Sequence, residues 1–391
     1  MNKANRVVYV DNNATTKVAP EVFDEMRPYF SDLYGNPSSM HTFGGQIGKK
    51  VQQAREKVAA ILNCDPVEIV FTSCGTESDN FAVKGVFEAF PNKKHFITTR
   101  VEHPAVLNTG GWLSKRGYDV TFLSVDNSGM LSLDELRASI RPDTGLVSIM
   151  WANNETGTIF PIPQIAQIVK EAGCLLHVDA VQVIGKLPVD LKKVPIDLLA
   201  LSGHKLHAPK GIGVLFVRKG TKIRPQMIGG HQERGRRGGT ENTPSIIGLG
   251  KACELAMHNM KDEVSRVKAM RDRLEDFVLN KISMTRLNGH PTERLPNTVS
   301  VSFEYIEGEA ILLDLDRLGI CASSGSACTS GSLEPSHVLR AMGVPFTCAH
   351  GSIRFSLSRY NTEDEIDYII SNLPAAITRL RNLSPYTPKV G

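Results

Sequence analysis

The sequence predicts an α/β protein, with a large domain built on a mostly parallel sheet covered by helices and a smaller α+β domain after it. Two observations predict this fold. Short apolar runs alternate with helical patterns as far as about Thr243, and the pattern changes after that point. The 391 residues have an ordinary globular composition, with 41 % hydrophobic and 22 % charged residues, which argues against disorder, a collagen-like structure and a disulfide scaffold.

Seven apolar runs in the first part predict strands, because each is short, rich in branched residues and bounded by turn-forming residues. They cover residues 67–72, 95–99, 120–125, 146–151, 175–178, 198–201 and 212–217. Helical periodicity separates some of them, at residues 81–90, 132–140 and 163–172. This interleaving indicates a mostly parallel sheet, whose ligands bind in a crevice near the strand ends.

The second part begins with a long amphipathic helix at residues 246–280, which we interpret as a connector. Thr362 is a good N-cap for the last predicted helix, since acidic residues fill its first turn. The elements after the connector are strands at 298–303 and 352–357 and helices at 309–318, 336–342 and 363–383. We assign residues 16–255 to the large domain, and residues 1–15 and 256–391 to the small one.

Charge and cysteine content argue against several classes of protein. The net charge of +4 is small and dispersed, so no nucleic-acid partner is expected. The seven cysteines are odd in number and none are spaced as C-x-x-C, which disfavours a disulfide framework or a structural zinc site. No secretory signal or membrane-length apolar run is visible, so we expect a cytoplasmic protein without a membrane span.

Two motifs end apolar strands with reactive side chains. In residues 200–211 (ALSGHKLHAPKG), Lys205 follows a strand end, where burial would lower its pKa and make it a nucleophile able to form a Schiff base. Asp179, in HVDAVQ, ends another strand as a carboxylate that needs a partner, such as a protonated ring nitrogen. Taken alone, a solvated loop lysine and a capping aspartate are the more ordinary interpretations.

A third motif, residues 71–80 (FTSCGTESDN), runs from a strand through a turn of small residues into a helix. Gly75 allows close approach and Thr76 offers a hydroxyl, so the helix start can bind an anion. Because neither G-x-x-x-x-G-K nor G-x-G-x-x-G is present, a phosphate monoester fits better than a nucleotide, although an ordinary N-cap is equally plausible here. The three motifs together are the attachments that pyridoxal 5′-phosphate requires.

The chain resembles fold-type-I pyridoxal-phosphate enzymes of the class V aminotransferase group, and more narrowly the NifS/IscS-type (class I) cysteine desulfurases. The matching motifs run nearly end to end: YVDNNATT, GNPSSMH, CGTESDN, VEHPAV, NNETGTI, HVDAVQ, SGHKLHAPKG, GGTENT and SSGSACTSGSLEPSHVL. The resemblance implies a large domain with a seven-stranded sheet. It also implies that L-cysteine is converted to L-alanine.

The resemblance implies roles for the matching residues. Lys205 is joined covalently to the cofactor, Asp179 pairs with the ring nitrogen, and His103 stacks on the ring and moves protons. Arg354, on a small-domain strand, binds the substrate carboxylate through two parallel hydrogen bonds; a surface arginine is the alternative. By the same resemblance, Gln182 and Asn154 contact the ring oxygen of the cofactor, and Asn154 also contacts the substrate. The cofactor phosphate is bound by Gly75, Thr76, Ser202, Gly203 and His204. Thr240 reaches the phosphate of the neighbouring subunit in a homodimer.

Cys328 lies in residues 323–332 (SSGSACTSGS), a run almost without apolar side chains that predicts an exposed, flexible loop. Since structural cysteines prefer burial, we expect Cys328 to be reactive and Cys321, which follows an apolar run, to be structural. A thiolate there needs activation on approaching the site, for instance through His103. The resemblance implies that Cys328 carries a persulfide, delivers sulfur to an iron–sulfur scaffold and transiently shares a cluster ligand with it.

Other interpretations stay open. A selenocysteine lyase or an aminotransferase would share the fold, and a non-catalytic partner in cluster assembly would use only the cysteines. The physiological acceptor of sulfur is not determined. Residues 229–243 (GGHQERGRRGGTENT) contain three arginines without aromatic residues, so we expect a mobile loop at a subunit interface in preference to an RNA-binding tract.

Overall fold

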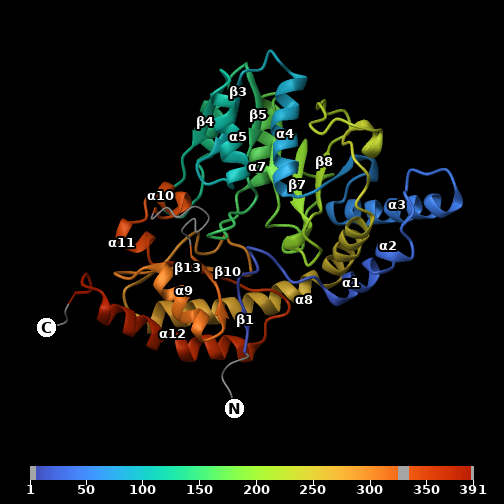
Figure 1. Ribbon diagram of the computed structural model, residues 1–391. Coiled ribbons are helices and arrows are strands. Elements are labelled where there is room, and N and C mark those ends of the chain that lie inside the picture. Colours follow the sequence, from blue (N-terminus) through green and yellow to red (C-terminus); the bar gives the residue numbers. More distant parts are fainter. Residues whose placement is uncertain (1–5, 325–333, 389–391) are drawn as a thin grey trace.

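The computed structural model describes residues 6–324 and 334–388, and Cys328 therefore lies outside the described residues (Figure 1). The large domain contains a seven-stranded sheet in the order β2-β8-β7-β6-β5-β3-β4, which confirms the predicted α/β fold. Neighbouring strands are parallel except that β8 runs antiparallel to β2 and β7. Its strands are β2 (Ile69–Thr72), β3 (His95–Thr99), β4 (Asp119–Leu123), β5 (Thr144–Ser148), β6 (Leu175–Asp179), β7 (Leu198–Ser202) and β8 (Gly213–Val217).

Helices cover both faces of this sheet, and each face has its own apolar cluster. One face packs against α4 (Gly75–Ala89) and α5 (Pro104–Ser114) through side chains such as Val86 and Phe96. The other face packs against α3, α6, α7 and the first half of α8. Burial on both faces explains why most of the strands are continuously apolar and not alternating. These helices are α3 (Thr42–Leu62), α6 (Leu133–Ser139), α7 (Ile162–Glu171) and α8 (Thr243–Lys281).

The long helix α8 leaves the large sheet and continues beneath a second, four-stranded antiparallel sheet in the order β12-β13-β10-β9 (Figure 1). The second half of α8 packs with α9 (Gly308–Arg317) and α12 (Glu363–Leu383) around a separate apolar core. The predicted cap of α12 is present, because Thr362 and Glu365 form a reciprocal capping box. The strands are β9 (Thr285–Leu287), β10 (Thr298–Phe303), β12 (Ser323–Ser324) and β13 (Ser352–Ser356).

Segments from both ends of the chain cross between the two cores. The first strand, β1 (Val8–Tyr9), pairs in parallel with β11 (Ile320–Cys321) of the second part. Conversely, α10 (His337–Ala341) and α11 (Phe346–Ala349) bury side chains in the core of the large sheet. Across the described residues, no helix has the length and apolarity needed to cross a bilayer.

Three helices between the first strand and the large sheet were not predicted. They are α1 (Pro20–Met26), α2 (Pro28–Ser31) and α3. The buried side chains of α3 include Ile47, Val51, Val58 and Leu62, a helical spacing that was legible in the sequence. The predicted strand at 146–151 also ends earlier, at Ser148, because the later residues lead into a turn.

Candidate active site

Three strands of the large sheet bring the candidate residues to one edge. Since β2 and β7 both run antiparallel to β8, and β6 is parallel to β7, all three end on the same side of the sheet. Asp179 is the last residue of β6, Ser202 ends β7, and α4 begins shortly after β2. The strand order thus assembles the three motifs, in the way expected of ligand sites in α/β sheets.

Lys205 ends a short 3-10 turn, Gly203–Lys205, directly after β7. Its Nζ donates to the carbonyl oxygens of Asn13 and Ala14 at 2.5 and 2.7 Å. Burial lowers the pKa of this amine to about 7, and the nearby Arg354 adds to that shift. A large fraction of the amine is therefore neutral near pH 7, which supports the prediction that Lys205 is a nucleophile.

Asp179 is buried, with one carboxylate oxygen accepting the Val181 N–H at 2.9 Å. Burial raises its pKa, while that hydrogen bond and the nearby His103 and Lys205 oppose the shift. A cationic partner would therefore be needed to hold this carboxylate ionised. Gln182, three residues further on, donates its Nε2 to the Asn13 carbonyl at 2.9 Å.

The start of α4 forms the candidate phosphate site. Gly75 is the first helical residue, and a Cβ there would lie 2.8 Å from Val181 Cγ2, so a larger residue would not fit. The Oγ of Ser202 is buried without a hydrogen-bond partner among the described residues. His204 donates or accepts at Thr15 Oγ1, 3.1 Å away, and burial lowers its pKa to about 4, so it is neutral.

His103 is the N-cap of α5, and its Nδ1 accepts the Ala105 N–H at 3.1 Å. A neutral ring in this arrangement carries its proton on Nε2. Although the side chain keeps contact with solvent, the surrounding protein removes part of its hydration and lowers its pKa. Asp179 opposes this shift, whereas Lys205 and His337 contribute to it. The ring is thus electrostatically linked to the lysine and the buried aspartate.

Arg354 projects from β13 of the second sheet and is largely buried. Its Nη2 donates to Asp11 Oδ1 at 2.7 Å and its Nη1 to the Asn154 carbonyl at 2.9 Å. Since Arg354 also contributes to the lowered pKa of Lys205, the guanidinium lies near the amine. A substrate carboxylate could exchange with the carboxylate of Asp11 at this guanidinium.

Comparisons with known proteins identify the family of this chain. The model of the family "Aminotransferase class-V" matches residues 8–369. The chain belongs to the class V aminotransferase family. A cysteine desulfurase from Trichormus azollae is 61 % identical over 380 residues, covering 97 % of this chain and 95 % of that protein. The cysteine desulfurase NifS of Azotobacter vinelandii is 55 % identical over 380 residues, covering 97 % and 94 %. A solved NifS-like protein superposes with a TM-score of 0.91 at 43 % identity, covering 96 % of this chain and all of that one.

Members of this family depend on pyridoxal 5′-phosphate, and the described residues fit it. The unpartnered Ser202 hydroxyl and the N-terminus of α4 suit the phosphate, and the buried Asp179 suits a protonated ring nitrogen. Thr76 is exposed beside them, and Asn154 is held at its carbonyl by Arg354. Gly203 packs against Ile212, where a Cβ would lie 2.7 Å from Cγ2, which accounts for a glycine at that position.

Thr240 is exposed, on the loop of residues 229–243. That loop was expected to be mobile and to lie at a subunit interface; within its own subunit it makes two ion pairs. Glu233 is buried and accepts two hydrogen bonds from Arg55, both 2.8 Å, and Arg237 pairs with Glu77 at 2.9 Å. Because Glu77 directly follows Thr76, the loop is tied to the candidate phosphate site of its own subunit.

Sequence reasoning did not single out two residues that organise the site. Asp11 holds Arg354, and Asn13 receives hydrogen bonds from Lys205 and Gln182 at its carbonyl oxygen. Both belong to the YVDNNATT segment, a polar run directly after an apolar strand. This pattern could have indicated that the two residues belong to the site. A polar run after a strand does not pack into the apolar core, so its polar groups must find hydrogen-bond partners elsewhere.

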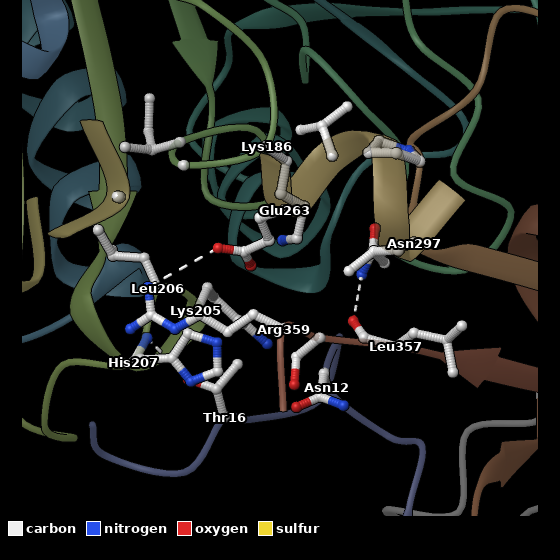
Figure 2. Close-up of a pocket in the computed structure, with 17 residues that line it drawn as sticks. Asn12, Thr16, Lys186, Lys205, Leu206, His207, Glu263, Asn297, Leu357 and Arg359 are labelled. Carbon is white, nitrogen blue, oxygen red and sulfur yellow. Dashed lines mark hydrogen bonds and ion pairs between the residues drawn. The ribbon is translucent and has the colours of Figure 1, made fainter. Parts of the chain in front are cut away.

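A small cavity lies behind Lys205, between the two domains (Figure 2). Its free volume of about 30 Å³ is room for one or two water molecules. Figure 2 shows polar side chains in its wall, among them Lys186 and Asn297, with Glu263 of α8 close to Arg359. The ion pair between Arg359 and Glu263 spans 3.7 Å. The wall of this cavity therefore presents polar side chains next to Lys205.

Proposed function

We propose that this chain is a pyridoxal-phosphate-dependent cysteine desulfurase, which converts L-cysteine to L-alanine and transfers the sulfur to Cys328. The observation that carries this proposal is the meeting of Lys205, Asp179 and Arg354 at one edge of the sheet in a chain of this family. Such an enzyme needs a nucleophilic amine and a buried carboxylate to hold the cofactor. It also needs a guanidinium to bind the carboxylate of its amino-acid substrate.

When bound, the cofactor supplies an acceptor for the electron pair released at the substrate Cα. Arg354 binds the substrate carboxylate and so fixes the Cα–H bond relative to Lys205. The neutral amine of Lys205 takes the Cα proton, which its lowered pKa permits near pH 7. Asp179 holds the positive ring nitrogen, and its burial keeps water from competing for that charge.

The transfer of the substrate sulfur to Cys328 needs no external oxidant. The thiolate of Cys328 attacks the substrate sulfur, a new S–S bond forms, and the Cβ–S bond breaks with its electron pair staying on carbon. That carbon takes a proton and becomes the methyl group of alanine. Cys328 is left as a persulfide. His103 exchanges protons with the thiol and the carbon, a role that its Nε2 supports because this atom carries the proton of the neutral ring.

The test of this function is Cys328→Ser, with Cys321→Ser as the matched control. We expect Cys328→Ser to retain the visible absorbance of the bound cofactor and to lose alanine and persulfide formation from L-cysteine. Cys321→Ser should keep both activities, because Cys321 is a half-buried strand residue. Unchanged alanine formation by Cys328→Ser would contradict the persulfide step. Turnover of selenocysteine alone, unaffected by the substitution, would favour a selenocysteine lyase, and transamination of other amino acids would favour an aminotransferase.

The proposal extends to partners. Thr240 is exposed on a loop that ion pairs hold in place, which supports a homodimer in which Thr240 reaches the partner subunit's phosphate. The acceptor of sulfur is an iron–sulfur scaffold, with which Cys328 transiently shares a cluster ligand. The six described cysteines are free thiols, which supports a reducing, cytoplasmic setting.

A further inference from the structure

The turn that carries His103 is fixed by buried hydrogen bonds. Glu102 is fully buried, and its Oε1 accepts from Thr99 Oγ1 and from the Met150 N–H, both at 2.9 Å. The carbonyl of Val101 accepts from Asn153 Nδ2 at 2.9 Å. All these partners belong to the large sheet or to the turn after β5. These hydrogen bonds restrain the side chain of Glu102 and the peptide bond between Val101 and Glu102. They do not restrain the carbonyl of Glu102, which belongs to the peptide bond with His103.

That carbonyl is bound by a residue from far along the chain. The Nε2 of His337 lies 2.9 Å from the Glu102 carbonyl oxygen. Since a carbonyl oxygen only accepts, the Nε2 of His337 must carry a proton. The bond therefore restrains the peptide unit that joins Glu102 to His103, and with it the backbone from which the His103 side chain extends.

His337 is itself well held. It is the first residue of α10, whose N-cap Ser336 accepts from the Val338 and Leu339 N–H groups. The Ser336 hydroxyl is also hydrogen-bonded to Glu155, which follows Asn154 in the site. Val338 and Leu339 are buried in the core of the large sheet. The capped start of α10 and its buried side chains therefore restrain His337, as is required of a residue that positions another.

We propose that His337 is a positioning residue for His103, acting through the Nε2–H···O=C bond to Glu102. The inference rests on the proposed function, in which His103 moves protons. Two titratable side chains face His337 from the elements packed against it, His103 of α5 and Glu155 of the turn after β5. Glu102 contributes its carbonyl, and Glu334 and Arg340 flank His337 on its own segment and pair with each other.

The experiment compares His337→Leu with His337→Gln. A glutamine amide has its nitrogen at the same bond count from Cβ as Nε2 and can donate to the Glu102 carbonyl, whereas leucine cannot. We expect His337→Leu to lower kcat for L-cysteine by about tenfold, a part of the 10²–10⁴ that a well-placed acid–base group supplies. KM should change little, and His337→Gln should restore most of kcat. Arg340→Gln, which breaks an exposed ion pair in the same segment, should leave kcat unchanged.

A second readout uses the cofactor-free protein. The pKa of His103, followed by NMR of labelled histidine and assigned with His103→Asn, should rise in both His337 variants, because His337 contributes to lowering that pKa. Only His337→Leu should also shift the His103 signal at a pH where the His103 ring is neutral. An equal loss of kcat in the leucine and glutamine variants, or an unmoved signal with unchanged kcat, would overturn the inference. Wild-type protein without desulfurase activity would instead contradict the proposed function.

Discussion

Burial sets the protonation of the residues around the site. His177, two residues before Asp179 on β6, has its pKa lowered to about 3, and it lies 3.5 Å from Asp79, whose pKa burial raises. Burial also raises the pKa of Glu102 to about 8. Glu102 is therefore largely protonated near pH 7. Asp179 remains as the carboxylate whose neighbours, His103 and Lys205, favour its charged form.

The reactivity of Lys205 gives a pH prediction at this scale. Burial lowers its pKa from 10.5 to about 7, so in cofactor-free protein the amine loses its proton around pH 7 and becomes reactive. We expect its labelling by an amine-specific reagent, followed by peptide mass spectrometry, to rise between about pH 6 and pH 8. Bound cofactor should protect it.

The matched variant is Arg354→Leu. Because Arg354 contributes to the lowered pKa of Lys205, its removal should raise that pKa and move the labelling profile to higher pH. A wild-type profile that rises only above about pH 9 would show that Lys205 is not desolvated as the structure indicates.

At the scale of elements, the loop of residues 229–243 is positioned by a buried ion pair. Glu233 and Arg234 both adopt left-handed backbone conformations, with φ of 49° and 60°, which cost energy in residues other than glycine. Glu233 meets Arg55 of α3 through two hydrogen bonds and also accepts the Phe71 N–H of β2. The pair thus joins a helix, a strand and the loop that presents Thr240.

We predict that Glu233→Gln destabilises the fold by about 3–5 kcal/mol, because it leaves the buried Arg55 without its charged partner. The measurement is the free energy of unfolding in urea at pH 7. Glu254→Gln is the control: it breaks an exposed pair with Lys57, whose loss should cost at most about 1 kcal/mol. Adding Arg55→Met to Glu233→Gln should recover part of the loss. Equal effects of Glu233→Gln and Glu254→Gln would contradict a structural role for the buried pair.

At the scale of the whole molecule, Asn13 links the two domains. Its side chain donates to Thr298 Oγ1 at 2.9 Å and accepts from Asn297 Nδ2 at 3.0 Å in the second part. Its carbonyl oxygen accepts hydrogen bonds from Gln182 and Lys205 of the large domain. The site lies where these cores meet, so its geometry depends on their relative placement.

Asn13→Ala should therefore affect both stability and catalysis. It removes the two hydrogen bonds of the Asn13 side chain to Thr298 and Asn297, at about 0.5–1.5 kcal/mol each, and it frees the second part to shift relative to Lys205. We expect a lower melting temperature and, because Arg354 lies on that part, a KM for L-cysteine raised more than kcat is lowered. The control is Asn127→Ala, at an exposed position. A raised KM without any thermal effect would place Asn13 in substrate binding alone.

The sequence by itself determined the strands and the motifs at their ends. The runs before Asp179, Lys205 and Gly75 were legible because strand burial and helix starts depend on local patterns. The helix α3 carried the same kind of signal and was missed. Cys328 and its persulfide stay a prediction, since that residue lies outside the described structure.

Only the tertiary structure decided which distant groups meet. Arg55 and Glu233 are 178 residues apart in the chain, and Glu102 and His337 are 235 apart. Nothing in either local pattern specifies the partner, because the strand order and the path of α8 set such contacts. The same holds for the pKa of Lys205, which follows from the depth of burial and from Arg354 on another sheet. The local sequence motifs indicated which residues form the site. Tertiary packing determines the pKa values of these residues and the distant groups that hold them in place.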